Sequence, residues 1–407
     1  MELTQKISQR NFLAFIWHAT FFALSFSFMD IDTVMPAMLL RAGGSNFHIG
    51  LLTTILLGGN WFAQLFFAPF LYNRPRKKPY LIIGIAIRVL ALFLFSLLFL
   101  YFQNINNQWF ITILLGLALI FAISGSFAGV SYTDILGKSV LQEKRKKFFS
   151  IKQVIFSIGI FISAIAVKKL LNLNSFPHNY FWLFFLASGF LLIASIGFFF
   201  IREFPVQIKK IKGFTNYYHA FKNEFKTNPR LIYFLLTINT LGIGLGMLPF
   251  IISFIKQEYG LSGNEVGNLL IFKTVGLIIA GVSLFFLSKK LKYRYILLTA
   301  FFISFSILIL VLFFSSHYFI FPIIFLMGGI FYSLFSISKS GILLEISTNE
   351  NRSLYAGLVG AGSILITLFP TLGGLIIDHF GFQFMFIIIL LILVSSLFFI
   401  WKLNCKA

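Results

Sequence analysis

The sequence predicts an all-α membrane protein with 12 transmembrane helices in two parallel six-helix repeats. Composition is the first observation: the chain is 58% hydrophobic and 11% charged, with a mean hydropathy of +0.92, whereas soluble domains contain about 25% charged residues. The second is that apolar runs of the roughly 20 residues needed by a spanning helix recur from residue 11 to residue 401. The third is that Lys and Arg gather in alternate loops. The apolar-polar alternation of a lipid-facing barrel is missing.

The order of the apolar runs predicts the domain organisation. We expect spans at residues 12–40, 48–72, 80–102, 109–133, 150–171, 180–201, 231–255, 265–287, 295–315, 318–341, 353–377 and 384–401. The longest polar connection divides them into an N-terminal six-helix bundle at 1–201, a cytoplasmic linker at 202–230 and a C-terminal six-helix bundle at 231–407.

The net charge of +21 reflects topology rather than nucleic-acid binding. Most of the 33 basic residues lie in the N-terminal tail, the central linker and every second loop, as cytoplasmic segments do. We therefore expect both termini in the cytoplasm and a multi-pass protein of the plasma (inner) membrane, with an uncleaved first span after Lys6 and Arg10. Cys405 is the one cysteine, so the sequence predicts no intrachain disulfide, metal site or cofactor.

An internal repeat supports the division into halves. The stretches "SYTDILGKSVLQEKR" (131–145) and "SKSGILLEISTNENR" (338–352) align without gaps at an offset of 207 residues. Each leaves a span, crosses a short cytoplasmic loop and enters the next span. Because six is an even number, the two halves share one orientation and are parallel repeats.

The chain resembles the major facilitator superfamily of secondary transporters over essentially its full length. That family carries the signature G-x-x-x-D-R-x-G-R-[RK] between spans two and three, where this sequence has "PFLYNRPRKK" (69–78). Arg74, Lys77 and Lys78 match, Asn73 replaces the aspartate, and both glycines are replaced. Two patterns of drug/proton antiporters are missing from spans four and five. The resemblance implies the fold, a monomer and transport by alternating access, without naming a substrate.

The loop that carries the signature predicts a cytoplasmic gate. Its candidates are Asn73, Arg74, Lys77, Lys78, Asp134 and Glu345. Basic loop residues that bridge to the two acids and to helix C-termini would hold the cytoplasmic side shut. In the alternative interpretation the loop cations only set topology and contact anionic lipid.

Two carboxylates follow the first apolar segment in a chain with only 12 acidic residues. Asp30 lies about 18 residues into the expected span, or roughly 27 Å along a helix. Asp30 and Asp32 are about 200° apart around a helix, so both can face one cavity only if the helix breaks. The long span and Pro36 favour a bend here. Either one of them, with Asp30 favoured, binds a cation or proton in the central cavity, or both sit at the outer rim beside Arg41.

Charged side chains inside other spans are costly, so we first consider a functional role for each. Lys273 lies about 9 residues into span eight, too deep for easy snorkelling, so we expect an anionic solute or partner, with Asp30 and Asp32 as candidates. For Arg88 we expect structural pairing or snorkelling, and for His18 an ordinary hydrogen bond. Lys339 is expected to snorkel from the inner end of span ten.

Neutral polar residues complete the candidates for the solute and ion cavity. Asn60 and Gln64 lie one turn apart in span two and can bind a solute or bridge helices. Asn239 lies in the glycine-rich stretch "TINTLGIGLGMLP" (237–249), which favours close helix packing or a substrate-contacting hinge.

The leading hypothesis is a secondary transporter that moves a small solute between two six-helix halves, with a proton as a candidate coupling ion. The sequence contains no Walker P-loop, so the chain itself is not expected to hydrolyse ATP. The alternatives are a membrane-embedded lipid- or glycan-modifying enzyme and a lipid scramblase or flippase. The scattered acids disfavour the enzyme, so no enzymatic activity is predicted.

Overall fold

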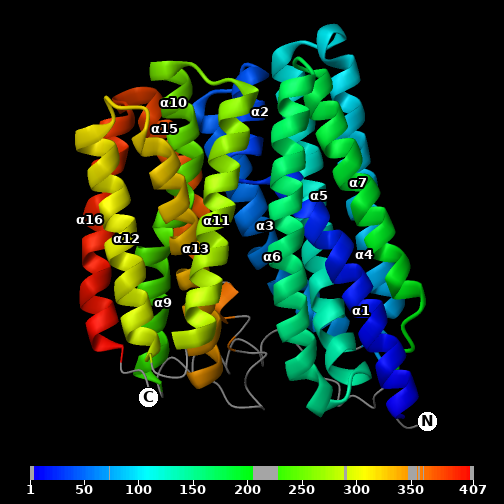
Figure 1. The fold of residues 1–407 in the computed structure, drawn as a ribbon. Helices are drawn as coiled ribbons and strands as arrows, with labels where there is room; N and C mark the ends of the chain where they lie inside the picture. Colours follow the sequence, from blue (N-terminus) through cyan, green and yellow to red (C-terminus); the bar gives the residue numbers. More distant parts are fainter. Residues whose placement is uncertain are drawn as a thin grey trace. The chain divides into compact units, whose positions relative to one another are not determined.

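The computed structural model describes residues 4–72, 74–204, 228–287, 291–346, 355, 358–360 and 362–403, and among these only the backbone of residues 60–66, 68, 69, 72, 146, 150 and 344. Every regular element in these ranges is a helix, as Figure 1 shows. The chain divides into two compact units. Unit 1 comprises Met1–Asp30, Arg41–Gly43 and Ile55–Ile211, and unit 2 comprises Ile31–Leu40, Gly44–Thr54 and Lys212–Ala407.

Unit 1 is built from long apolar helices. They are α1 (Gln5–Phe26), α4 (Lys78–Leu98), α5 (Asn107–Ser139), α6 (Gln142–Leu173) and α7 (His178–Phe199), with the 3-10 helix η2 (Phe99–Asn104) after α4. Helix α4 packs against α5 and α7, and α1 packs against α6 and α7. Polar caps fix the helix starts: the side chain of Asn106 accepts a hydrogen bond of 2.9 Å from the backbone N–H of Gln108 at the start of α5.

Unit 2 combines the C-terminal helices with short pieces of the first two spans. Its helices are α2 (Val34–Arg41, except its last residue), the first turns of α3 (Asn46–Tyr72), α9 (Pro229–Gly242), α10 (Met247–Tyr259), α11 (Gly263–Leu287), α12 (Tyr293–Phe314), α13 (Ile320–Ile346), α15 (Ile364–Phe380) and α16 (Phe382–Lys402). Helix α13 packs against α11 and α12, and α16 packs against α9, α12 and α15. Gly381, at φ +86°, forms the tight turn between α15 and α16.

The first and seventh spans are both interrupted by a 3-10 helix. The first runs α1, η1 (Ser27–Met29), a turn and α2, and the seventh runs α9, η3 (Ile243–Gly246) and α10. Pro36 and Pro249 are each the third residue of the helix that follows the break, where the missing N–H costs no intrahelical hydrogen bond. The bend expected near residue 30 is therefore confirmed, and its counterpart in the second half fits a parallel repeat.

The helices agree with the expected spans. Within the described residues, eleven helices are long and apolar enough to cross a membrane, and the shorter apolar helix Asn46–Gly59 belongs to the expected second span. The twelve-helix fold is confirmed. The expected linker falls mostly on residues 205–227, which lie outside the described part of the chain.

Candidate functional site

A buried ion pair joins the broken first span to α11 within unit 2. Lys273 Nζ lies 2.5 Å from Asp32 Oδ2, and the two side chains are only 5% and 6% exposed. Lys273 is ten residues from the start of α11, or about 15 Å along the helix axis. The pair therefore lies well inside the apolar layer, where each charge alone would be costly.

The backbone around each partner explains how they meet. Asp32 lies in the turn between η1 and α2, where the chain leaves helical geometry and the side chain need not follow a helical face. On the other side, Gly276 and Gly329 let α11 and α13 touch: a Cβ on Gly329 would come within 2.0 Å of Lys273 O, and one on Gly276 within 2.0 Å of Leu326 O. This crossing holds the backbone of Lys273 in place.

Asp30 lies just before Asp32 in the break. Its side chain is buried, and its backbone N–H donates to Ser27 O at 3.3 Å as the end of η1. The two carboxylates belong to different compact units, Asp30 to unit 1 and Asp32 to unit 2. Of the two partners that the sequence left open for Lys273, the ion pair in unit 2 is made by Asp32.

Asn239 ties α9 to the start of α15. Its Nδ2 donates to Leu235 O at 2.8 Å and to Gly362 O at 2.7 Å, and its Oδ1 accepts from Leu365 N at 2.9 Å. These bonds use both amide protons, so the described contacts favour helix bracing. The side chains of Asn60 and Gln64, and all of Asn73, lie outside the described residues.

The start of α3 is fastened to α15 by contacts that sequence reasoning missed. Asp378 accepts hydrogen bonds from Asn46 Nδ2 at 2.9 Å and from Phe47 N at 3.0 Å, which places a carboxylate at the N-terminus of α3. A Cβ on Gly50 would come within 2.1 Å of Pro370 O, so the two helices touch at this point. The isolated acid near the end of an apolar span was the available signal, but its partner is more than 300 residues away in the chain.

The predicted gate residues form a polar network at one end of unit 1. Lys77, with a side chain only 6% exposed, pairs with Asp134 at 2.9 Å, and Lys138 pairs with the other oxygen of Asp134. Burial lowers the pKa of Lys77 from its ordinary value, and the hydrogen bond and charge of Asp134 oppose that shift. Glu203 accepts from the backbone N–H groups of Lys77 and Lys78 at 2.7 Å each and so caps α4.

The remaining gate candidates have partners within their own units. Arg74 is exposed, with its guanidinium 4.8 Å from the centroid of the Phe70 ring. In unit 2, Glu345 forms an ion pair with Arg230. Sequence reasoning missed Glu203 and Arg230, which belong to the ends of the expected linker, because linker charges carry no signal that distinguishes a cap from a solvated residue.

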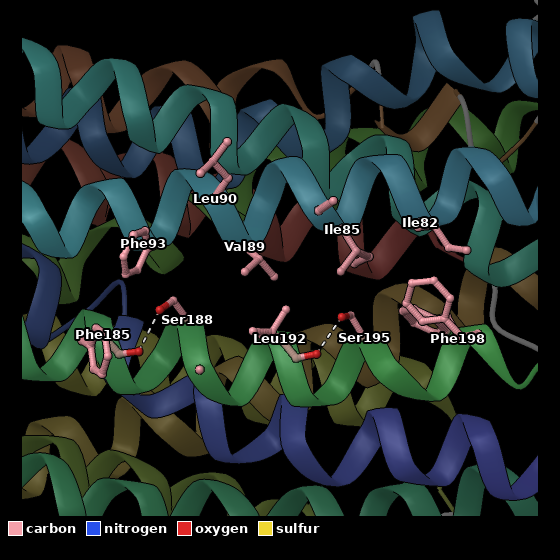
Figure 2. Close-up of a pocket in the computed structure, with 13 residues that line it drawn as sticks. Ile82, Ile85, Val89, Leu90, Phe93, Phe185, Ser188, Leu192, Ser195 and Phe198 are labelled. Carbon is pink, nitrogen blue, oxygen red and sulfur yellow. Dashed lines mark hydrogen bonds between the residues drawn. The ribbon is translucent and has the colours of Figure 1, made fainter.

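A cavity of about 570 Å³ lies between α4 and α7 in unit 1 and has no polar group to offer a solute (Figure 2). Apolar side chains line it, among them Ile85, Val89 and Leu192. Its hydroxyls bond to their own helix: Ser188 Oγ donates to Phe185 O, and Ser195 Oγ donates to Leu192 O. This cavity suits a lipid chain better than a polar solute. Across the described residues, no group of three or more His, Cys, Asp or Glu side chains is arranged to hold a metal ion.

The apolar helices, the broken spans and the buried ion pair define a polytopic α-helical membrane protein. The sequence profile of the Major Facilitator Superfamily matches residues 20–245 and 232–404. The chain therefore belongs to the major facilitator superfamily and is a secondary transporter, which confirms the resemblance seen in the sequence. No curated protein matches the sequence significantly.

Solved structures agree on the fold. A D-xylose–proton symporter matches with a TM-score of 0.72 and 14% identity over 96% of this chain and 97% of that chain. A nucleoside transporter matches with a TM-score of 0.69 and 16% identity over 97% and 99% of the two chains. A bacterial homologue of the human lysosomal transporter Spinster, in an inward-facing conformation, matches with a TM-score of 0.67 and 13% identity over 98% and 97%.

Proposed function

We propose that the chain moves a small solute by alternating access between two six-helix halves, residues 1–201 and 231–407, joined by the linker 202–230. The protein is a monomer in the inner (plasma) membrane. Its two halves have the same orientation, and both termini lie in the cytoplasm. Support comes from the one-sided distribution of Lys and Arg and from the matching breaks in the first and seventh spans.

The observation that carries the mechanism is the buried Asp32–Lys273 pair. It holds the segment 31–40 against α11 through two side chains that are almost fully buried. Protonation neutralises Asp32, and a solute anion that pairs with Lys273 replaces Asp32; either event removes the attraction between the two side chains. Release of the pair therefore couples a binding event to the separation of residues 31–40 from α11.

A labelling experiment tests this coupling without knowledge of the solute. Ile49 is buried in unit 2 at the start of α3. A cysteine is placed at this position in a Cys405→Ser background. Its reaction with an impermeant maleimide added from outside reports when the start of α3 becomes accessible to water. Asp32→Asn and Lys273→Gln should each raise the labelling rate severalfold, because either change removes the ion pair. Glu258→Gln, at an exposed acid of α10, is the matched control and should leave the rate unchanged. Equal rates in all variants would refute the role of the pair.

Proton coupling is tested in vesicles that contain purified protein and a trapped pH-sensitive dye. Solutes from a broad panel that enter wild-type vesicles should change the internal pH, and Asp32→Asn should retain solute exchange while losing the pH change. Solute entry into wild-type vesicles with no pH change would exclude the proton as the coupling ion.

A further inference from the structure

Four polar side chains from four helices gather inside unit 1, and none of them forms an ion pair with an acid among the described residues. They are His18 of α1, Arg88 of α4, Tyr132 of α5 and Lys152 of α6, called here the cationic cluster. The expectations for His18 and Arg88 were an ordinary hydrogen bond and structural pairing or snorkelling, and Lys152 carried no signal beyond the charge of the adjoining loop. The structure links them through ring contacts: Arg88 lies over the ring of Phe22, which stacks on His18 at 5.5 Å between centroids.

Arg88 crosses from α4 toward α1 and α5 over aromatic faces. Its Cζ lies 4.2 Å from the ring centroid of Phe121 and 5.7 Å from that of Phe22. Gly125 makes room for the guanidinium, since a Cβ there would come within 3.0 Å of Arg88 Cζ. Buried Arg88 Nε has no hydrogen-bond partner among the described residues. The Arg88 side chain is therefore held inside the bundle by ring faces, and its Nε–H donates no hydrogen bond to a described residue.

The other members continue the cluster. The rings of His18 and Tyr132 are 5.4 Å apart, and Lys152 Nζ lies 5.7 Å from the centroid of the Tyr132 ring. His18 is 9% exposed, and its buried Nδ1 finds no hydrogen-bond partner in the described part of the chain. The hydroxyl of Tyr132 is also buried and unpaired within those residues. The expected hydrogen bond of His18 is thus not made by Nδ1 within the described residues.

The cluster contains two cations, and no ion pair to either of them is seen among the described residues. Asp134 pairs with Lys77 and Lys138, and it pairs with neither Arg88 nor Lys152. Cations inside a membrane bundle are costly and are normally paired or functional. Buried donors left without acceptors add to that cost. An anion at this place would satisfy the guanidinium, the ammonium and the unpaired donors together.

We propose that the cationic cluster binds an organic anion with an aromatic or apolar body, and that this anion is the solute carried by the proposed transport cycle. A carboxylate or phosphate accepts hydrogen bonds from the guanidinium fork of Arg88 and charge-pairs with Lys152. Tyr132 OH supplies a further donor. The rings of Phe22 and Phe121 offer faces to the apolar part of the molecule.

The test is equilibrium binding to the full-length purified protein in detergent, which needs no transport. The probes are benzoate and phenyl phosphate, with benzamide and benzylamine as the neutral and cationic controls of similar shape. Binding is measured by calorimetry and by the rise in melting temperature. We expect wild-type protein to bind at least one of the anions and neither control. Arg88→Gln and Lys152→Gln should each weaken that binding at least tenfold, equivalent to about 1.4 kcal/mol.

Matched variants separate the site from folding and from charge in general. Lys169→Gln removes an exposed cation from the same helix as Lys152 and should bind like wild type. Gly125→Leu keeps every charge but displaces the guanidinium, so it should weaken binding even if Arg88→Gln does not fold. Asp32→Asn, which tests the coupling pair, should still bind the anion.

Each outcome bears on one proposal. Failure of wild-type protein to bind either anion, or equal affinities in Gly125→Leu, Lys152→Gln and wild type, would overturn the anion site and leave the role of the Asp32–Lys273 pair standing. Anion binding with unchanged cysteine labelling in Asp32→Asn would support the site and refute that pair instead.

Discussion

Replacing Lys273 by methionine removes the ammonium group that pairs with the buried carboxylate of Asp32. At the observed separation of 2.5 Å, an effective dielectric constant of about 20 gives an attraction of about 7 kcal/mol before the desolvation cost is subtracted. Measured losses on removal of one partner of a buried pair are about 3–5 kcal/mol. We therefore expect Lys273→Met to lower the free energy of unfolding by about 3–5 kcal/mol, and Asp32→Asn to lower it by a similar amount.

The double variant Asp32→Asn/Lys273→Met removes both charges, so its loss should be smaller than the sum of the two single losses by a coupling energy of about 1–3 kcal/mol. The assay is unfolding by SDS in mixed micelles, monitored by tryptophan fluorescence. It is applied to wild type, the two single variants and the double variant. Lys402→Met, at an exposed cation at the end of α16, is the charge-loss control and should change stability by about 0.5 kcal/mol or less. Additive losses, equal to the sum of the single variants within about 0.5 kcal/mol, would refute the coupling.

Further predictions concern the glycine crossing and the polar end of unit 1. Gly329→Leu should prevent accumulation of folded protein, measured by size-exclusion profile, because its Cβ would come within 2.0 Å of Lys273 O. Asp134→Asn should lower the pKa of buried Lys77 further, since Asp134 raises it. A lowered lysine pKa means that the unfolded chain binds more protons, so stability of this variant should rise more steeply than that of wild type as pH increases toward about 10.4. Glu203→Gln should weaken two caps on α4 and cost about 1–2 kcal/mol in mixed-micelle unfolding.

Each of these predictions has a matched control. Gly116→Leu adds a side chain where a Cβ meets no atom within 4 Å, and should fold normally. Lys138→Gln removes the more exposed of the two lysines that pair with Asp134. It should change the pH dependence of stability less than Asp134→Asn does. Glu143→Gln, at an exposed acid in the first turn of α6, should leave stability nearly unchanged. Controls that behave like their test variants would show that the named contacts do not cause the effects.

The fold and part of the candidate site were predictable because hydrophobicity and charge act locally. Spans follow from apolar length, and the interruption near Asp30 follows from an overlong span with a proline beyond it. The depth of Lys273 in an apolar helix predicted the need for a partner. Which carboxylate meets it depends on how the chain leaves the helix at residues 30–33, and no local pattern encodes that path.

Other features depend on two helices at once and could not be read from one. Gly329 is one of 31 glycines, and only the crossing with α11 distinguishes it from the rest. Lys152 lies near the start of the expected span 150–171, close to the basic loop, whereas α6 begins at Gln142, ten residues before it. The lack of a hydrogen-bond partner for His18 Nδ1 among the described residues likewise depends on the helices packed around it.

The interruption of the first span has a mechanical consequence. In an uninterrupted helix, one inserted residue turns everything beyond it by about 100°. Here α1 and α2 are separated by a 3-10 segment and a turn, so the azimuth of each piece is set by its own neighbours. A residue added between Met29 and Asp30 can be accommodated in the turn. A residue added within Val34–Arg41 would rotate the C-terminal half of α2 and remove its buried side chains from their packing contacts.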